Sequence, residues 1–487
     1  MSASREKKLR QDQTASGYVD PKAEKELEKK KAEKRSNVLY SVIAVLFVLV
    51  VAASFLWRSN VISRNATALT IDGEKYSAAE VNFYYQNVYR GFLQSNSYFI
   101  SYLGLDTNAS LKSQTVNATA ASMMGVEEGS SWHDYIMDNT VKQMTMVQRG
   151  LKQAQEEGYQ FPASVQEQYE DSLNSLKTSA ESTGMSVKAY LQRNLGAIMT
   201  EKVYNQQVLR MLQYQAYAQS YSDSLTYSAA DLQAAYDEDP DAYCSVDIEY
   251  VSFTTGLSSD ATDAEKSAAM EEAKAKAEAV LAAYAEGRSF EESAGDGTYT
   301  HLAHADRSVT SDMLTWAFAA DRAEGDTTVA EQSSGYVAVL FHSRSRNDYH
   351  TVSVRHILVD SEEKANELLQ QYNDGEKTED AFAALAVANS TDPGSASNGG
   401  LYSNIYKGQM VPSFEDWCFD PARQSGDTGI VESEYGFHVM YFVETNELPY
   451  WEYKATNTLK SSAVNDWYDA ITDGVTAEQL DAIEYVG

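Results

Sequence analysis

Two histidines stand out because each lies inside a short run of apolar, β-branched residues. His356 interrupts the run 352–359, and His438 interrupts the run 436–443. Histidine titrates near neutral pH and forms hydrogen bonds through both ring nitrogens, so such a pair could tune the protonation and geometry of a neighbouring polar group. The alternative for each histidine alone is a structural imidazole that orders its strand through hydrogen bonds.

The two histidines can meet only if the two runs form neighbouring strands of one sheet. Between the runs the sequence predicts a polar helix, a loop with the letters STDPGSASNGGL and a turn with the letters KGQMVPSFEDWCF. The glycine, proline and serine of the loop are typical of a chain that turns back on itself. We therefore expect residues 348–447 to form one small domain that contains both histidines.

Four short motifs in this region are HILV, GGL, GQMVPSFE and GFH. In their order and spacing the region resembles the parvulin family of peptidyl-prolyl cis/trans isomerases. The resemblance covers the whole of one small domain. It implies a four-stranded antiparallel sheet with surrounding helices, and catalysis of rotation about X-Pro bonds.

The resemblance also implies a role for individual residues. His356 and His438 match the central histidine pair of the family, and Asp392 falls where the family carries an Asp or Cys that faces the substrate amide. These three are the catalytic candidates. The substrate-binding candidates, which match or lie near the family's apolar pocket for the proline ring, are Leu401, Met410, Phe414, Phe419 and Tyr435. We expect Asp392 and the pocket to act on the substrate, and the histidines to maintain the architecture.

An internal repeat precedes this region. Residues 244–347 reproduce the opening strand, the helix and the closing strand of the later copy. Tyr250 stands where the later copy has His356, Val337 stands where it has His438, and the GGL motif is missing. We expect a degenerate parvulin-like domain that has kept the fold and lost the chemistry.

No cofactor or metal is expected in either copy. Isomerisation breaks no bond, and its barrier of roughly 18–20 kcal/mol arises from amide resonance. A dry pocket with polar groups suited to a twisted amide would bind the transition state better than either ground state. His301 and His304 have no recognised metal-binding spacing. The letters DSEE that follow the HILV motif would repel a phosphate, so an unphosphorylated X-Pro substrate is expected.

One departure from the family pattern leaves a second function open. Residues 402–406, YSNIY, make the turn after GGL longer than is usual in the family and lack its expected glycine. If this altered the site, the protein would be a chaperone that uses its parvulin domains only to bind peptides. The set of His356, Asp392, Phe414 and His438 favours the isomerase instead.

The region 66–243 is rich in tyrosine and predicts long helices. A hairpin over 69–76 has an Asp-Gly turn, and Ser77 with Glu80 makes a capping box for the first helix. A further amphipathic helix lies within 448–487. In this layout the chain resembles the SurA/PrsA-like extracytoplasmic foldases. The resemblance implies a chaperone lobe, built from the first region with the C-terminal helix packed on it, that binds unfolded or newly exported polypeptides.

The N-terminal region predicts a membrane anchor. Residues 1–37 hold eleven Lys or Arg against seven Asp or Glu, and residues 38–57 form an uncharged run long enough for a helix of about 30 Å. The positive-inside rule then puts the N-terminus in the cytoplasm and the bulk of the chain outside, as a single-pass protein of the cell membrane. A signal peptide cleaved at the small residues 51–53 is the alternative.

Composition sets the remaining limits. The net charge of −32 argues against nucleic acid as a partner, and two cysteines do not make a disulfide framework. The expected fold class is an α+β multidomain protein with a transmembrane helix, a helical chaperone lobe, two parvulin-like domains and a C-terminal helix. The expected function is that of a membrane-anchored foldase that isomerises X-Pro bonds in exported proteins and binds unfolded chains.

Overall fold

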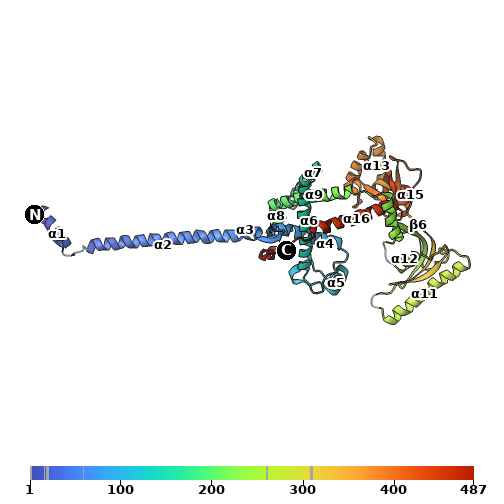
Figure 1. Ribbon diagram of the computed structural model, residues 1–487, viewed down its shortest axis with the longest axis horizontal. Helices are drawn as coiled ribbons and strands as arrows, with labels where there is room; N and C mark the ends of the chain where they lie inside the picture. The colour runs from blue at the N-terminus through green and yellow to red at the C-terminus, as the bar shows by residue number, and fades with distance from the viewer. Residues whose placement is uncertain (1–2, 16, 18–20, 59, 259–260, 308–310) are drawn as a thin grey trace. The chain divides into compact units, whose positions relative to one another are not determined.

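The computed structural model describes residues 3–15, 17, 21–58, 60–258, 261–307 and 311–487. They form two compact units, which Figure 1 shows as ribbons. The first unit comprises Met1–Ser224 with Asn465–Gly487, and the second comprises Leu225–Val464. Both units combine helices with antiparallel sheets, so the chain is an α+β multidomain protein.

The N-terminal segment departs from the expectation. Residues 38–57 do not form a helix of their own but are the second half of α2 (Pro21–Arg58), whose first half is rich in Lys and Glu. α1 (Ala3–Ala15) precedes α2, and α3 (Val61–Asn65) follows it. Among the helices of the described residues, none has the length and the apolar character needed to cross a membrane. On this finding the predicted transmembrane helix over 38–57 is wrong.

A three-stranded antiparallel sheet contains strands from both ends of the first unit. β1 (Thr67–Ile71) and β2 (Glu74–Ser77) form the predicted hairpin, in which Asp72 and Gly73 have φ values of 49° and 80°. Two positive φ angles at the centre are typical of a type I′ turn. β11 (Ala477–Gln479) pairs with the other side of β1. The C-terminal residues thus complete a sheet that the hairpin begins.

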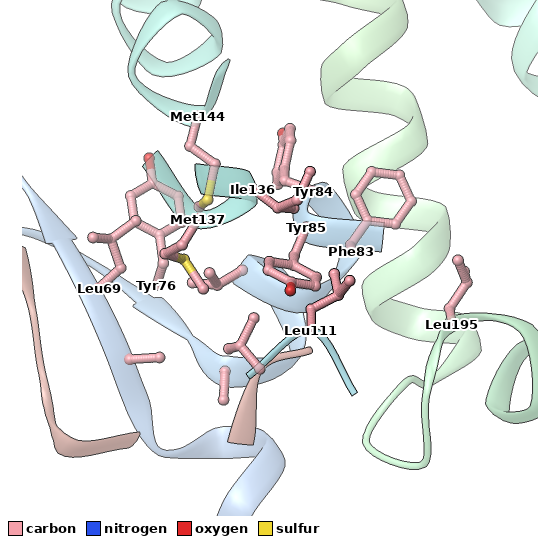
Figure 2. Close-up of a cluster of buried hydrophobic side chains, with 14 of the residues drawn as sticks. Leu69, Tyr76, Phe83, Tyr84, Tyr85, Leu111, Ile136, Met137, Met144 and Leu195 are labelled. Atoms are coloured by element: carbon pink, nitrogen blue, oxygen red, sulfur yellow. The ribbon is translucent and has the colours of Figure 1, made fainter. Parts of the chain in front are cut away.

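Helices cover this sheet. The predicted capping box starts the first of them, because Ser77 N–H donates to Glu80 at 2.8 Å and Glu80 N–H donates to Ser77 Oγ. The helical elements are α4 (Ala78–Ser95), η1 (Leu111–Ser113), α5 (Ala118–Met124), α6 (Trp132–Glu156), α7 (Ala163–Ser182), α8 (Val187–Leu195), α9 (Glu201–Ser224) and η4 (Asp481–Tyr485). Aromatic residues of α4 and methionines of α6 belong to one buried core, and Figure 2 labels Tyr84, Tyr85, Met137 and Met144 among its side chains.

The second unit contains two four-stranded antiparallel sheets with the same topology. The first has the order β4-β3-β6-β5, from β3 (Cys244–Thr254), β4 (Thr298–Ala305), β5 (Thr327–Gln332) and β6 (Gly335–Arg346). The second has the order β8-β7-β10-β9, from β7 (His350–Val359), β8 (Leu401–Ile405), β9 (Thr428–Ser433) and β10 (Gly436–Pro449). The two central strands of each sheet are the first and the last strand of one sequence repeat. We call β3–β6 with their helices the first repeat, and β7–β10 with theirs the second repeat.

Helices lie on both faces of each sheet. In the first repeat these are α11 (Asp263–Ala285) on one face and the short α12 (Asp312–Ala317) on the other. In the second repeat α13 (Glu362–Asp374) and α14 (Glu379–Asn389) cover one face, and α15 (Pro412–Cys418) covers the other. The remaining elements of the unit are α10 (Ala229–Glu238), η2 (Pro240–Tyr243), η3 (Ala396–Asn398) and the first part of α16 (Tyr450–Thr472).

The strand registers align the two repeats residue by residue. Tyr250 of β3 pairs with Val339 of β6, and His356 of β7 pairs with Met440 of β10. Tyr250 and His356 are therefore equivalent. Counting two residues back along β6 and β10 makes Val337 equivalent to His438. The first sheet thus carries a tyrosine and a valine at the positions of the two histidines.

Candidate active site

The two histidines meet between the central strands of the second sheet. His356 Nδ1 lies 3.0 Å from His438 Nδ1, and the rings stack with their centroids 5.2 Å apart and an interplanar angle of 27°. Both side chains are buried, with 3% and 5% of their surface exposed. Such burial requires hydrogen-bond partners for the polar ring atoms. Each of the four ring nitrogens has one.

The hydrogen bonds of the histidine pair form a chain in which each group donates to the next, from Ser433 through His438 and His356 to Asp392. Asp392 Oδ2 lies 3.1 Å from His356 Nε2, and because an ionised carboxylate only accepts, His356 carries its proton on Nε2. A neutral His356 therefore accepts at Nδ1 from His438 Nδ1–H. His438 Nε2 accepts in turn from the Ser433 hydroxyl at 2.7 Å. The carboxylate thus fixes the tautomers of both imidazoles through one continuous chain.

The charges of the site follow from burial and these contacts. Burial lowers the pKa of His356, although Asp392 opposes the shift. Burial and the neighbouring imidazole lower the pKa of His438 to about 4. For Asp392, burial acts to raise the pKa, but hydrogen bonds from Ser395 and His356 outweigh it and hold the pKa below its ordinary value. At neutral pH the site therefore contains two neutral imidazoles beside one carboxylate.

We expect the second repeat to lose stability as the pH falls from 6.5 toward about 4. Both histidines have a lower pKa in the folded chain than the ordinary 6.5, so in this range the unfolded chain binds more protons and the free energy of unfolding decreases. The urea midpoint of the full chain should fall between about pH 7 and about pH 4.5. This fall should be smaller in His438→Gln. Equal falls in both proteins would contradict the assignment.

An apolar group of side chains lies on the same face as the histidine pair. Phe414 of α15 directs its ring edge-on at both imidazoles, with centroid distances of 5.4 Å to His356 and 5.2 Å to His438. Only 2% of Phe414 is exposed. Met410 and Phe419 are partly buried and pack against the same core. Of the five predicted pocket residues, Phe414 thus contacts both histidines, and Met410 and Phe419 belong to the apolar cluster around it.

Leu401 and Tyr435 have different positions from those that the sequence suggested. Leu401 pairs with Arg355 across the sheet, and its side chain therefore shares the face of Arg355, opposite to that of His356. The next residue, Tyr402, lies on the histidine face, with its ring centroid 5.3 Å from that of His356. Tyr402, and not Leu401, is therefore the residue of this strand that contacts His356. Tyr435 is 67% exposed and belongs to none of the buried clusters.

Three polar residues of the site were missed in the sequence. The Ser395 and Tyr402 hydroxyls both donate to Asp392 Oδ2, the latter at 3.1 Å, and Ser395 also lies 3.0 Å from His356 Nε2. Ser433 completes the chain behind His438. One signal was available, because Asp392 begins an Asp-Pro-Gly-Ser sequence and a β-turn returns its fourth residue to its first. The positions of Tyr402 and Ser433 depend on which face of the sheet each side chain occupies, and the sequence alone does not determine this.

The unusual YSNIY turn is accommodated by a β-bulge. Ser403 and Asn404 together lie opposite the single residue Ser353, and pairing resumes normally on both sides. Asn404 has a φ of 55°, a left-handed conformation that asparagine tolerates where glycine was expected. The first repeat has a bulge at the same place, where two residues of β4 lie opposite Asp247. The length of the turn is thus a feature of both repeats and leaves Tyr402 on the histidine face.

Close backbone contacts explain the glycines of the GGL motif. A Cβ on Gly400 would lie 2.1 Å from the carbonyl oxygen of His356, and Gly400 has a φ of 72°. Its carbonyl accepts from His356 N–H at 2.8 Å. Arg355 Nη1 donates to the carbonyl of the neighbouring Gly399 at 3.0 Å. The motif therefore holds the Asp392 loop directly against the strand that carries His356.

Comparisons with known proteins find relatives of part of this chain. The family model of the PPIC-type PPIase domain matches residues 338–446. The foldase protein PrsA 1 of Listeria innocua is 38% identical over 96 residues, which are 20% of this chain and 31% of that protein. The parvulin-like PPIase of Rickettsia bellii is 38% identical over 101 residues, which are 20% of this chain and 34% of that protein. The chain thus spans about a third of the length of the curated relatives that it matches.

A crystal structure of PrsA from Bacillus subtilis aligns with 71% of this chain and 89% of its own, at 14% identity and a TM-score of 0.30. His356, Asp392 and His438 all lie within the residues that the family model matches. Residues 338–446 belong to the parvulin-type, or PPIC-type, family of peptidyl-prolyl isomerase domains.

Proposed function

We propose that the chain is a foldase of the PrsA kind. Its second repeat catalyses cis/trans isomerisation of X-Pro bonds in unfolded, exported polypeptides, and its first unit binds the same polypeptides. The observation that carries the proposal is the hydrogen-bonded chain from Ser433 through His438 and His356 to Asp392, beside the apolar side chains of Phe414 and Met410. The first repeat, with Tyr250 and Val337 at the histidine positions, takes no part in catalysis.

Rotation about the X-Pro bond needs an environment that disfavours the planar amide. In the planar state, resonance puts partial negative charge on the carbonyl oxygen, and twisting the bond removes it. A carboxylate facing that oxygen repels the planar state more strongly than the twisted one, which lowers the barrier. Asp392 is suited to this role, because its side chain is 15% exposed and its charge is held in place by three donors. Met410, Phe414 and Tyr402 would hold the proline ring.

The neutral imidazoles keep Asp392 in position. His356 donates to the carboxylate, and His438 with Ser433 prevents His356 from adopting the other tautomer. A protonated His356 would partly neutralise the charge that disfavours the planar amide. Burial opposes that protonation by lowering the pKa of His356. The histidines are therefore positioning residues in this proposal, whereas Asp392 faces the substrate.

Exposed aromatic residues support the chaperone half of the proposal. In the segment after α4, Tyr98, Phe99 and Tyr102 are 90%, 51% and 70% exposed. Large exposed apolar side chains close together are typical of binding surfaces. Aromatic side chains suit many different apolar partners, because their affinity comes from area more than from specific hydrogen bonds. The location of residues 60–487 outside the cytoplasm stays a prediction.

The two halves can be separated in one refolding experiment with the full chain. The client is a protein whose refolding is limited by a proline isomerisation of about 10–100 s. The wild-type chain should accelerate that phase and suppress aggregation of the client. Asp392→Ala should lose the acceleration and keep the suppression, and Tyr98→Ser/Tyr102→Ser should do the reverse. If the wild-type chain suppresses aggregation without acceleration, the alternative of a chaperone without catalysis is correct.

A further inference from the structure

Three metal-ligating side chains, those of Asp247, His301 and His342, converge on the first sheet, and Glu249 contacts one of them. They lie on the face opposite to that of Tyr250, which stands at a lost histidine position. Asp247 and Glu249 are two residues apart on β3 and share one face of the sheet. His301 on β4 pairs directly with Glu249, and His342 comes from β6 on the opposite side of β3. Asp247, His301 and His342 each offer a ligand atom within 4.8 Å of the others. Tyr250 points to the other face, where it packs with the α12 core.

Two β-bulges bring these side chains together. Ile248 pairs with Phe341 and Asp247 pairs with Ser343, so His342 is an extra residue between the two pairs. A second bulge, in β4, lies opposite Asp247 on the other side of the same strand. Bulges redirect side chains and are frequent beside functional sites. Here the bulges lie where the carboxylates of β3 contact His301 from β4 on one side and His342 from β6 on the other.

Each imidazole already contacts a carboxylate. His301 Nε2 lies 2.7 Å from Asp247 Oδ1, and His342 Nε2 lies 2.9 Å from Glu249 Oε1. The two rings are near each other, with centroids 5.9 Å apart. The four side chains are 20–45% exposed, so an ion can reach them from solvent. Two carboxylates and two imidazoles are side chains of the kinds that bind divalent transition metal ions.

We propose that His301, His342, Asp247 and Glu249 bind a divalent transition metal ion of the zinc class. Imidazole favours zinc, copper and nickel over magnesium and calcium, and four protein ligands in a tetrahedron are typical of structural zinc sites. Zn–N and Zn–O bonds of about 2.0–2.2 Å place neighbouring ligand atoms of a tetrahedron roughly 3.3 Å apart. The two hydrogen-bonded pairs must therefore open slightly, while the other ligand atoms, now within 4.8 Å of one another, must come closer. Rotation of the half-exposed side chains supplies this adjustment. The bound ion would tie β3, β4 and β6 together.

The second repeat provides an internal comparison. The registers place Ser353, Arg355, Leu401 and Val443 at the positions equivalent to Asp247, Glu249, His301 and His342. The second repeat has the same two bulges, but none of its four residues there is a zinc ligand. The convergence of ligands is therefore a property of these side chains in the first repeat and does not follow from the fold alone. It is also separate from the isomerase site.

The test uses the full chain, freed of metal with a chelator and titrated with Zn²⁺ in a calorimeter. We expect one site with a Kd in the micromolar range, weakened on the order of 10–100-fold in His301→Ala/His342→Ala. His304→Ala is the matched control, because His304 lies on the same strand outside the cluster, and it should bind as the wild type does. Co²⁺ in place of Zn²⁺ should give visible absorption bands in the wild type and the control alone.

Folding of the variants is checked by circular dichroism, and the half-exposed histidines are expected to be replaceable. Asp247→Asn serves as a second variant that keeps the shape of the side chain and removes its charge. Zn²⁺ should also raise the thermal midpoint of the wild type and not that of the double variant. Equal binding by the wild type and the double variant would show adventitious binding to surface carboxylates and overturn the proposal. Absence of binding at about 1 mM Zn²⁺ would overturn it as well.

Discussion

Asp392→Ala in the full chain should reduce kcat/KM for isomerisation of a short X-Pro peptide on the order of 10²-fold. The substitution removes the charge that disfavours the planar amide, and it leaves the His356 Nε2–H with only Ser395 as a partner. Without the carboxylate, the proton of His356 is no longer fixed on Nε2, so the tautomers of both histidines are no longer fixed either. Peptide exchange measured by NMR gives the rate, and the imidazole nitrogen shifts of His356 and His438 report the tautomers.

Two controls separate the charge from the hydrogen bonds. Asp392→Asn keeps an acceptor oxygen and removes the charge, so it should lose activity with smaller changes in the imidazole shifts. Asp416→Ala removes an equal charge from an exposed position on α15 and should leave the rate within about twofold of the wild type. A normal rate in Asp392→Ala would contradict the role of this carboxylate in the site.

Phe414→Ala should have the largest effect on stability of any single change in the pocket, about 3–5 kcal/mol. The ring is 2% exposed and packs edge-on against both imidazoles, so its removal leaves a cavity beneath the histidine pair. Urea unfolding of the full chain measures the loss. The same substitution should abolish activity, but the change in the fold would contribute to that result.

A milder series separates the pocket from the core. Met410→Ala removes a partly buried side chain of the pocket and should raise KM while it costs less stability. Tyr435→Ala, at a 67% exposed position, should change the free energy of unfolding by no more than about 0.5 kcal/mol. A large effect of Tyr435→Ala on KM would show that the exposed tyrosine contacts the substrate after all.

The sequence was sufficient for features that depend on residue type and local order. The histidines on two strand-like runs, the capping box at Ser77 and the hairpin at Asp72-Gly73 each express a short-range rule, and the structure has all three. The equivalence of Tyr250 with His356 also follows from the registers. These features need no knowledge of which face of a strand is buried.

The sequence was insufficient to predict which face of the sheet each side chain of a strand occupies, which we call the strand phase. Leu401 and Tyr402 are adjacent and both could line a pocket, but a shift of one residue moves a side chain to the other face. The bulge at Ser403 and Asn404 decides the phase, and it is defined only by pairing with Ser353. The same limit applies to the cluster around Asp247, which exists because of a bulge at His342.

The N-terminal helix shows another limit. The apolar run 38–57 was interpreted by itself, whereas the structure continues it from a charged segment as one helix, α2.

The three polar residues that complete the active site, Ser395, Tyr402 and Ser433, were also missed. They are ordinary residue types, and only their distances to Asp392 and His438 distinguish them.

The central claim is that the second repeat, and only that repeat, catalyses rotation about X-Pro bonds. Its most direct test is the cis/trans exchange rate of a short unphosphorylated X-Pro peptide, measured by NMR with the full chain at catalytic concentration. We expect accelerated exchange with the wild type and with Tyr250→Phe in the first repeat, and exchange close to the uncatalysed rate with Asp392→Ala. Uncatalysed exchange with the wild-type chain, or unchanged acceleration with Asp392→Ala, would contradict it.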